Sequence, residues 1–283
     1  AGYSAASLRI EKEMKMKEKI PASVNVLGLS TVHMKGREDA EEIRRLLSLC
    51  GIRVISMPGG GSNWEDIMDA PSASLNIVVR DELGLSLAKQ MEQDFGIPYM
   101  SCGLPYGTDG TVAWLSEIIE KLGAGELTRA SHEAAKLKEF LLRKGNNLES
   151  LWGPLWFDAV LISAPPSEAL GIAEAIRSEW IDTARLVIHA QGETEKSTPA
   201  ADAIRVVMKN EKEIAKDYED WQGGLVLSSS HETHLLRRMG RSFTGFHIAL
   251  PSHDEVHFSD LPQCGLRGAG YLYEQLWNAK LRK

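Results

Sequence analysis

Three cysteines are the side chains of this sequence best suited to chemistry. Cys102 lies at the end of a segment expected to be a strand, and Cys264 follows a polar loop and precedes Gly265 and the start of an expected helix. A helix N-terminus favours negative charge, so this position should lower the pKa of the Cys264 thiol and suit it to binding a metal. Cys50 lies on the apolar face of another expected helix, which indicates a core residue.

Histidines supply a second set of candidate groups. His231 and His234 lie on one face of an expected helix, but the run His-Glu-Thr-His is one residue short of the zinc motif HExxH. Since no third ligand is apparent, we do not expect zinc here. His231 alone, at a strand-to-helix turn, could donate to a bound ligand, or it could be a capping or solvated residue. The remaining histidines of the C-terminal part lack metal spacing and are interpreted as exposed or structural: His247, His253 and His257.

Two glycine-containing segments could bind an anion. Gly59-Gly60-Gly61 could bring backbone N–H groups close to a phosphate, but it lacks the spacing of GxGxxG and the Lys-Ser/Thr of a P-loop. A flexible loop is the alternative. Arg267, between Gly265 and Gly268 at a helix start, could bind an anion or pair with a carboxylate across the molecule.

Alternating apolar and amphipathic segments position these groups. Apolar runs at 24–30, 52–57, 75–79 and 97–101, and again at 157–163, 185–190, 225–227 and 243–250, predict strands buried on both faces. Amphipathic stretches between them predict helices, including a long one over 200–221. The predicted fold is α/β, with two Rossmann-like domains (1–150 and 151–283), each a four-stranded parallel sheet flanked by helices, and a cleft between them. Strand ends are where such sheets bind ligands.

Composition narrows the class of protein. The chain has 283 residues, 43% of them hydrophobic and 25% charged, with a net charge of −7. This charge gives no support for binding nucleic acid or an anionic membrane. No apolar run approaches the roughly 20 residues of a membrane span. Three widely spaced cysteines argue against a disulfide framework, so we expect a reducing, cytoplasmic compartment.

Several short motifs, taken in order, resemble the nitrogenase component-1 superfamily: molybdenum–iron protein subunits, cofactor-assembly scaffolds and dark-operative protochlorophyllide reductases. The matching segments span about 250 residues, and they are Asn25-Val26-Leu27-Gly28, Glu41-Glu42-Ile43-Arg44-Arg45-Leu46-Leu47, Leu75-Asn76-Ile77-Val78, Phe95-Gly96-Ile97-Pro98-Tyr99 with Gly107-Thr108 and Thr111, Ser228-Ser229-Ser230-His231-Glu232 with Met239-Gly240, and Gly265-Leu266-Arg267-Gly268-Ala269.

The resemblance implies that part of a longer subunit is present. Family subunits have three α/β domains, and this chain is similar to the second and third. Cysteines for the iron–sulfur cluster at the subunit interface belong to the first. We therefore expect a fragment, because Ala1-Gly2-Tyr3-Ser4 resembles the segment that leaves the first domain; a protein that works without this cluster is the alternative. We expect the isolated chain to be inactive.

The resemblance also implies roles for particular residues. Arg80 falls where the catalytic nitrogenase subunit has its cofactor-binding cysteine, and Cys264 falls where it has its cofactor-binding histidine, so dinitrogen reduction is not expected. Arg80, Cys102, His231 and Cys264 should converge on one cavity. Cys264 would be a metal ligand or proton donor, and Arg80 and His231 would bind carboxylates. The other cofactor-binding candidates are Pro165, Ser167, Ser229 and Arg267.

The leading hypothesis is therefore an oxidoreductase subunit whose cavity holds a metallocluster or a tetrapyrrole. Its implied partners are a homologous sister subunit and an ATP-dependent iron–sulfur reductase protein that delivers electrons. The second hypothesis is a non-catalytic scaffold for metallocofactor assembly. The third is a metal-free, two-lobed small-molecule-binding or glycosyltransferase-like protein, with its ligand at 59–62 or 228–231.

Overall fold

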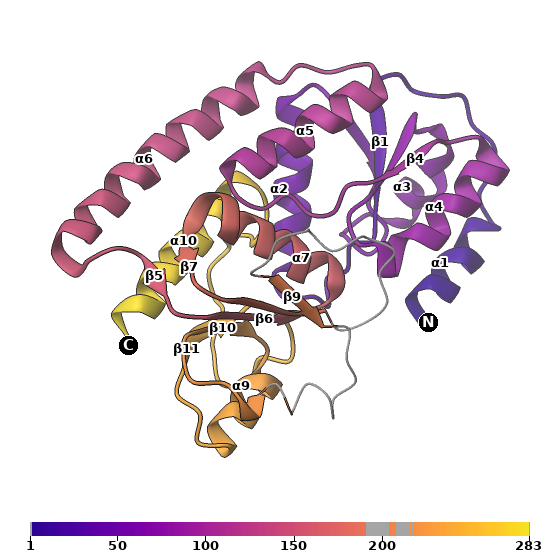
Figure 1. Ribbon diagram of the computed structural model, residues 1–283. Coiled ribbons are helices and arrows are strands. Elements are labelled where there is room, and N and C mark those ends of the chain that lie inside the picture. Colours follow the sequence, from indigo (N-terminus) through magenta and orange to yellow (C-terminus); the bar gives the residue numbers. More distant parts are fainter. Residues whose placement is uncertain (1, 191–203, 208–215, 217, 283) are drawn as a thin grey trace.

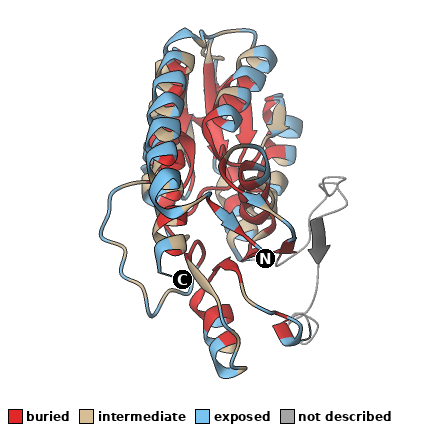
Figure 2. Ribbon diagram, turned by 60° about the vertical axis from the view of Figure 1, so that its left-hand side comes forward, coloured by how far each residue is buried: buried red, intermediate tan, exposed pale blue. Residues whose placement is uncertain are grey.

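The computed structural model describes residues 2–190, 204–207, 216 and 218–282, and it contains two parallel sheets with helices packed on them (Figure 1). We call the first sheet with its helices the first lobe and the second sheet with its helices the second lobe. The predicted α/β class is confirmed. Strands are the most completely buried elements, and helices present exposed outer faces (Figure 2).

The first lobe has the strand order β2-β1-β3-β4. Its strands are β1 (Ser23–Leu27), β2 (Arg53–Ser56), β3 (Leu75–Val78) and β4 (Tyr99–Ser101). Its helices are α1 (Gly2–Glu11), α2 (Gly36–Leu49), α3 (Trp64–Asp69), α4 (Asp81–Phe95), α5 (Thr108–Leu122) and the long α6 (Thr128–Trp152). All side chains of β1 and β3 are buried, as the apolar runs predict for the centre of a parallel sheet.

The second lobe has a five-stranded sheet in the order β11-β10-β6-β8-β9, and beside it lies a small two-stranded sheet of β5 and β7. Its strands are β5 (Trp156–Phe157), β6 (Val160–Ala164), β7 (Asp182–Thr183), β8 (Leu186–Ala190), β9 (Ile204–Val207), β10 (Leu225–Ser228) and β11 (Thr244–His247). Its helices are α7 (Pro166–Ala175), which continues as one π-helical stretch (Ile176–Trp180), α9 (Ser230–Arg238) and α10 (Gly265–Leu281).

Strand β9 corrects one prediction from the sequence. Helical spacing predicted a helix over 200–221, but Ile204–Val207 pair in parallel with β8 as an edge strand. Isoleucine and valine favour strands because their branched side chains are restricted in a helix. Much of the rest of that predicted helix, including 208–215, lies outside the described residues.

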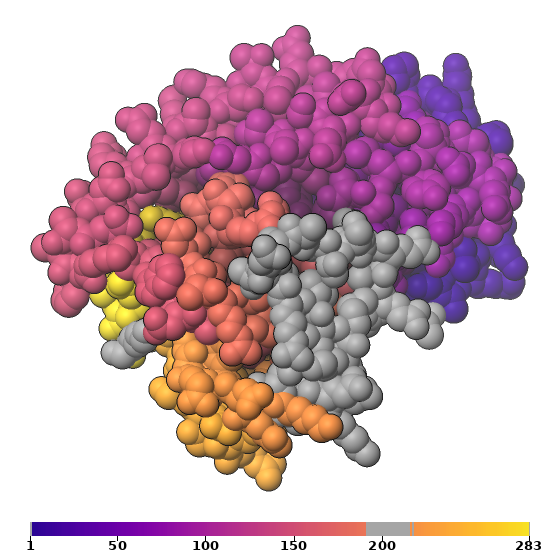
Figure 3. All heavy atoms as spheres, viewed as in Figure 1, coloured from indigo at the N-terminus to yellow at the C-terminus, as the bar shows by residue number. Residues whose placement is uncertain are grey.

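Helices α6 and α10 connect the lobes. Helix α6 forms a ridge along one side of the molecule, from the first lobe toward the C-terminal helix (Figure 3). Helix α10 packs against α2, α5 and α6 as well as against β11. Buried apolar residues of both lobes belong to one continuous core, which includes Val24 and Ile77 of the first and Ile162 and Leu227 of the second. Among the described helices, none combines the length and hydropathy needed to cross a membrane.

A carboxylate of the second lobe caps a helix of the first. Glu179 accepts hydrogen bonds from the backbone N–H groups of Thr108 (2.6 Å), Asp109 (3.0 Å) and Gly110 (3.0 Å) at the N-terminus of α5. These N–H groups have no partner within the helix and carry its positive dipole end. A Cβ at Gly107, which has φ +76°, would lie 2.1 Å from the Glu179 carboxylate, so a side chain there would displace this cap.

Replacement of this cap should destabilise the protein measurably. We expect Glu179→Gln to lower the free energy of unfolding by about 1–2 kcal/mol, because one neutral oxygen replaces a carboxylate that serves several donors. Urea denaturation measures the change. Glu174→Gln is the matched control, since Glu174 pairs only with Arg177 on an exposed surface. Equal effects of the two substitutions would contradict the capping role.

Candidate functional site

Arg80 is the centre of the candidate site. It lies two residues after the end of β3 and immediately precedes α4, and its side chain is completely buried. Its Nη2 lies 2.6 Å and its Nε 2.8 Å from Oε1 of Glu168 in the first turn of α7. The ion pair therefore joins the end of a first-lobe strand to a second-lobe helix. At this point the cleft expected between the lobes is filled.

Asp39 brings two further elements to Arg80. It lies in the first turn of α2, with Oδ2 4.0 Å from Nη2 of Arg80. Its Oδ1 accepts the backbone N–H groups of Gln263 (2.7 Å) and Cys264 (3.0 Å), just before α10. One carboxylate therefore ties α2 to the start of the C-terminal helix.

His33 is the solvent-facing member of this group. Its Nδ1 lies 3.2 Å from Oε1 of Glu168, and its side chain is 22% exposed. We call His33, Asp39, Arg80 and Glu168 the junction cluster. Each belongs to a loop or a first helical turn near the carboxyl end of a strand, which is the ligand-binding edge of open α/β sheets.

The cluster shifts the pKa values of its two carboxyl groups in opposite directions. Burial raises the pKa of Asp39 to about 6, against the opposing effects of Arg80 and the two backbone N–H groups. Burial acts in the same direction on Glu168, but the closer Arg80 and the hydrogen bond with His33 overcome it and lower the pKa. Arg80 therefore favours the ionised form of Glu168, whereas burial favours the protonated form of Asp39.

Cys264 shows a different environment from the one predicted. It is the residue before α10 and is fully buried, and its Sγ lies 3.8 Å from the backbone oxygen of Asp39. Burial, followed by the negative charges of Asp39 and Glu42, raises the thiol pKa well above its ordinary value. The predicted lowering by the helix N-terminus is wrong, because desolvation and two carboxylates outweigh the helix dipole.

Three other predicted residues lie around the same edge. Cys102 follows β4, where its N–H bonds to the backbone oxygen of Val78 (3.1 Å) on the strand that leads to Arg80, and it is half-buried. Pro165 immediately precedes α7. Ser167, in the first turn of α7, donates to Oε2 of Glu82 (2.7 Å) across the lobes. These positions suit the predicted cavity edge, and their roles stay predictions.

The remaining predicted residues serve visible structural contacts. Ser229 caps α9, with its hydroxyl and its N–H bonded to the Glu232 carboxylate. His231 follows on the exposed side of that helix. Arg267 donates its backbone N–H to Glu42 (3.2 Å), while its guanidinium is 41% exposed and lies 3.9 Å from Asp260. Convergence of His231 with Arg80 and Cys264 stays a prediction.

The glycine run has its own packing role. The backbone oxygen of Gly59 accepts the N–H of Thr31 (2.9 Å), and a Cβ at Gly59 would lie 2.4 Å from the oxygen of Leu29. The Ser62 hydroxyl accepts the N–H of Met57 (2.8 Å). Close packing of this loop on its neighbours explains the glycine at position 59 without a bound anion.

Sequence reasoning missed the acidic half of the junction cluster. Asp39, Glu168 and His33 are not among the site residues predicted from the sequence. The usable signal was that each acidic residue lies in the first turn of a helix that follows a strand. That signal is weak, since acidic residues are common there for their interaction with the helix dipole.

The arrangement defines a two-lobed α/β protein with a polar junction at its strand ends, and comparison identifies its family. The family model for nitrogenase component 1 type oxidoreductases matches residues 1–281. The chain belongs to this family, which confirms the resemblance seen in the sequence.

Its relatives and structural neighbours are consistent with this assignment. The chain is 24% identical over 282 residues to the B subunit of light-independent protochlorophyllide reductase from Prosthecochloris aestuarii (strain DSM 271 / SK 413), covering 91% of this chain and 51% of the relative. The corresponding protein of Chlorobium phaeovibrioides (strain DSM 265 / 1930) is 36% identical over 112 residues, 38% of this chain and 21% of the relative. A solved structure described as nitrogenase Cp1 at pH 6.5 shares the fold, with a TM-score of 0.73 and 17% identity over 99% of this chain and 64% of that one. The chain thus spans about half the length of the curated relatives that it matches along most of its length.

Loss of the Glu168 charge should be among the most destabilising changes. We expect Glu168→Gln to lower the free energy of unfolding by about 3–5 kcal/mol, because it leaves the Arg80 cation buried without its nearest counter-charge. Adding Arg80→Met should recover part of this loss. Chemical denaturation of both variants measures it, with exposed Glu41→Gln as control. A double variant less stable than Glu168→Gln would contradict the pairing.

Asp39 should make stability depend on pH with the opposite sign to a salt-bridged carboxylate. Because its pKa is raised from 3.8 to about 6, the folded state keeps a proton that the unfolded state has lost. The unfolding free energy of the wild type, relative to Asp39→Asn, should therefore fall as pH rises from about 4 to about 6. The asparagine oxygen can still accept both N–H groups. A relative stability that rises over this range would show that Arg80 governs Asp39 instead.

Proposed function

We propose that this chain is the ligand-facing part of a nitrogenase component 1-like reductase subunit, and that the ligand is a tetrapyrrole carrying a carboxylate. The observation that carries the proposal is the buried Arg80 guanidinium at the strand-end junction of the lobes. Arginine recognises carboxylates through paired, charge-assisted hydrogen bonds. The family match over residues 1–281 and relatives named as B subunits of protochlorophyllide reductase support this substrate class.

The described thiols do not fit an iron–sulfur cluster held by this chain alone. Such clusters are held by several thiolates together. Cys50 ends α2 within the core, Cys102 lies by Val78, and Cys264 lies against Asp39 with a raised pKa. Each thiol therefore faces a different part of the structure. A cluster that delivers electrons would therefore be held outside these residues.

Charged groups at the junction fit an organic ligand better. A ligand carboxylate could replace Glu168 as the partner of Arg80, since both offer the same pair of acceptor oxygens. Exchange of this kind would separate the first turn of α7 from Arg80 and open the junction. The mouth of the site would then be lined by His33 and Cys102, which are both partly exposed.

Reduction of a tetrapyrrole double bond consumes two electrons and two protons. In this proposal an ATP-dependent iron–sulfur reductase protein supplies the electrons, and a homologous sister subunit completes the complex. His33 would pass one proton to the ligand at the edge of the site, and solvent would supply the other. Glu168, 3.2 Å from the His33 ring, would orient that ring while Arg80 binds the ligand.

The test is a titration with protochlorophyllide. The full natural protein is first purified anaerobically together with its sister subunit. We expect saturable binding by absorbance, weakened at least about tenfold by Arg80→Lys, because lysine loses the paired geometry of arginine. Arg53→Ala is the control, since Arg53 is exposed at the opposite, N-terminal end of β2.

The possible outcomes separate the hypotheses. Binding that Arg80→Lys leaves unchanged would overturn the assigned site. A brown, iron-containing complex that transfers its cluster to an acceptor and does not bind protochlorophyllide would establish the scaffold function instead. A colourless, metal-free complex without protochlorophyllide binding would favour a different small ligand.

A further inference from the structure

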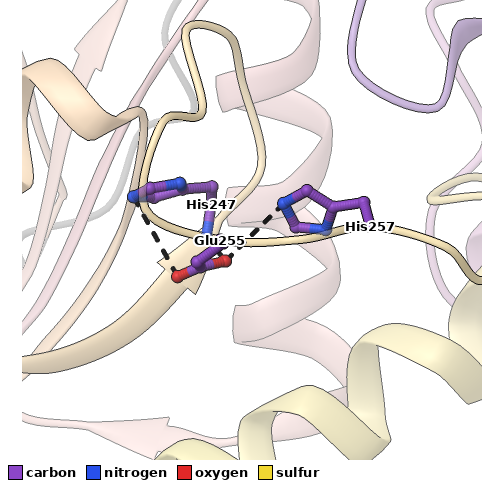
Figure 4. Close-up of side chains that lie close together, drawn as sticks. All are labelled: His247, Glu255 and His257. Carbon is purple, nitrogen blue, oxygen red and sulfur yellow. Dashed lines mark hydrogen bonds and ion pairs between the residues drawn. The ribbon is translucent and has the colours of Figure 1, made fainter.

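The loop between β11 and α10 gathers three metal-binding side chains that the junction cluster does not use. His247 ends β11, while Glu255 and His257 lie in the loop that follows. One ligand atom from each lies within 4.8 Å of the others. Figure 4 shows both imidazole rings reaching toward the Glu255 carboxylate between them. Within the described residues, no other group of three such side chains meets this distance.

The distances suit a small cation. Nε2 of His247 lies 4.0 Å from Oε1 of Glu255, and Nε2 of His257 lies 3.8 Å from Oε2. In a tetrahedral site with bonds of about 2.0–2.2 Å, neighbouring ligand atoms are about 3.3–3.5 Å apart. These two distances end on different oxygens of Glu255, and one atom from each of the three residues lies within 4.8 Å of the others. The donors therefore need to approach one another by at most roughly 1.5 Å to share one ion.

Neighbouring groups already orient the donors. The Ser252 hydroxyl lies 3.2 Å from Nε2 of His257 and 2.8 Å from Nδ1 of His247, whose Nε2 faces the Thr233 hydroxyl at 3.3 Å as well as the carboxylate. An oxygen of Asp254 lies 3.4 Å from the same Nε2, and Asp254 is itself held by Arg237 and Ser230. Outer contacts of this kind fix the tautomer and ring orientation of histidines in metal sites.

We propose that His247, Glu255 and His257 form a site for a divalent transition-metal ion, with Zn²⁺ as the ion best matched by two imidazoles and one carboxylate. This donor set is also that of zinc sites with an open fourth position. Glu255 and His257 are 29% and 20% exposed, so an ion could enter from solvent. The inference does not depend on the proposed tetrapyrrole site.

A bound ion would fix the loop that leads to the junction cluster. The same loop runs on to Gln263 and Cys264, whose N–H groups bind Asp39. Lys35 of the first lobe also donates to the backbone oxygen of Ser259 in this loop. The metal would therefore hold the first part of this loop, while the last part, at Gln263 and Cys264, binds Asp39 next to Arg80.

The experiment is metal binding by the tag-free, full natural protein after treatment with chelator. We expect one Zn²⁺ per chain with micromolar or tighter affinity by calorimetry. Co²⁺ should bind in its place with a visible spectrum of nitrogen and oxygen ligands, without a thiolate charge-transfer band. Zn²⁺ should raise the melting temperature, since it binds only the folded arrangement.

Variants locate the site. His257→Ala and Glu255→Gln should each weaken Zn²⁺ binding by at least about tenfold and abolish the thermal shift. His253→Ala is the matched control, because His253 lies in the same loop and is exposed, outside the group of three. Circular dichroism of each variant checks that it is folded. Failure to bind, unchanged affinity in both variants, or a thiolate band that both variants remove would overturn the assignment.

Discussion

A permanently charged guanidinium sealed inside the protein constrains the structure more than any other group. Arginine remains protonated at any ordinary pH, and a buried charge is tolerated only when other groups surround it with partners. Arg80 finds these partners on α2 and α7, and Asp39 in turn binds the segment before α10. Four parts of the chain, far apart in sequence, must therefore meet at one strand end for the cation to be stable.

Polar contacts set how the lobes meet, while apolar packing keeps them together. The core is continuous across both lobes, which accounts for their association by ordinary burial of apolar surface. Apolar packing is not directional, whereas hydrogen bonds and ion pairs are. Glu179 at the N-terminus of α5 and Glu168 at Arg80 therefore fix the relative orientation of the two sheets. Contacts of this type can also exchange partners with a charged ligand.

The sequence predicted the architecture well because short-range patterns carry it. Continuous apolar runs located the central strands, and Gly96 and Gly123 ended helices in the left-handed conformation as expected of glycine. Strand β9 was missed because a short edge segment rich in β-branched residues was embedded in a stretch with helical spacing. Periodicity cannot separate these two cases in a short segment.

The candidate site was only half predictable for a different reason. Arg80 was predicted through the family resemblance and Cys264 first through its place before a helix, but the partners that determine their chemistry are far away in the chain. Asp39 is 225 positions from Cys264, and Glu168 is 88 positions from Arg80. The Cys264 thiol shows the effect most clearly. Its place before a helix favours a low pKa, but burial and the carboxylates of Asp39 and Glu42, which are distant in sequence, raise the pKa. His247 and His257 were likewise interpreted as exposed or structural because they lack metal spacing. Glu255, which lies between them in the sequence and close to both in the structure, was not considered.

The position of the C-terminal helix has a consequence for the order of folding. The 17-residue helix α10 packs on α2, α5 and α6, although the whole second sheet separates it from them in the sequence. Part of the surface of the first lobe is therefore covered only by residues that follow the second sheet. Contacts between residues this far apart form late in folding, so we expect the two lobes to reach their final packing together although their sheets are separate in sequence.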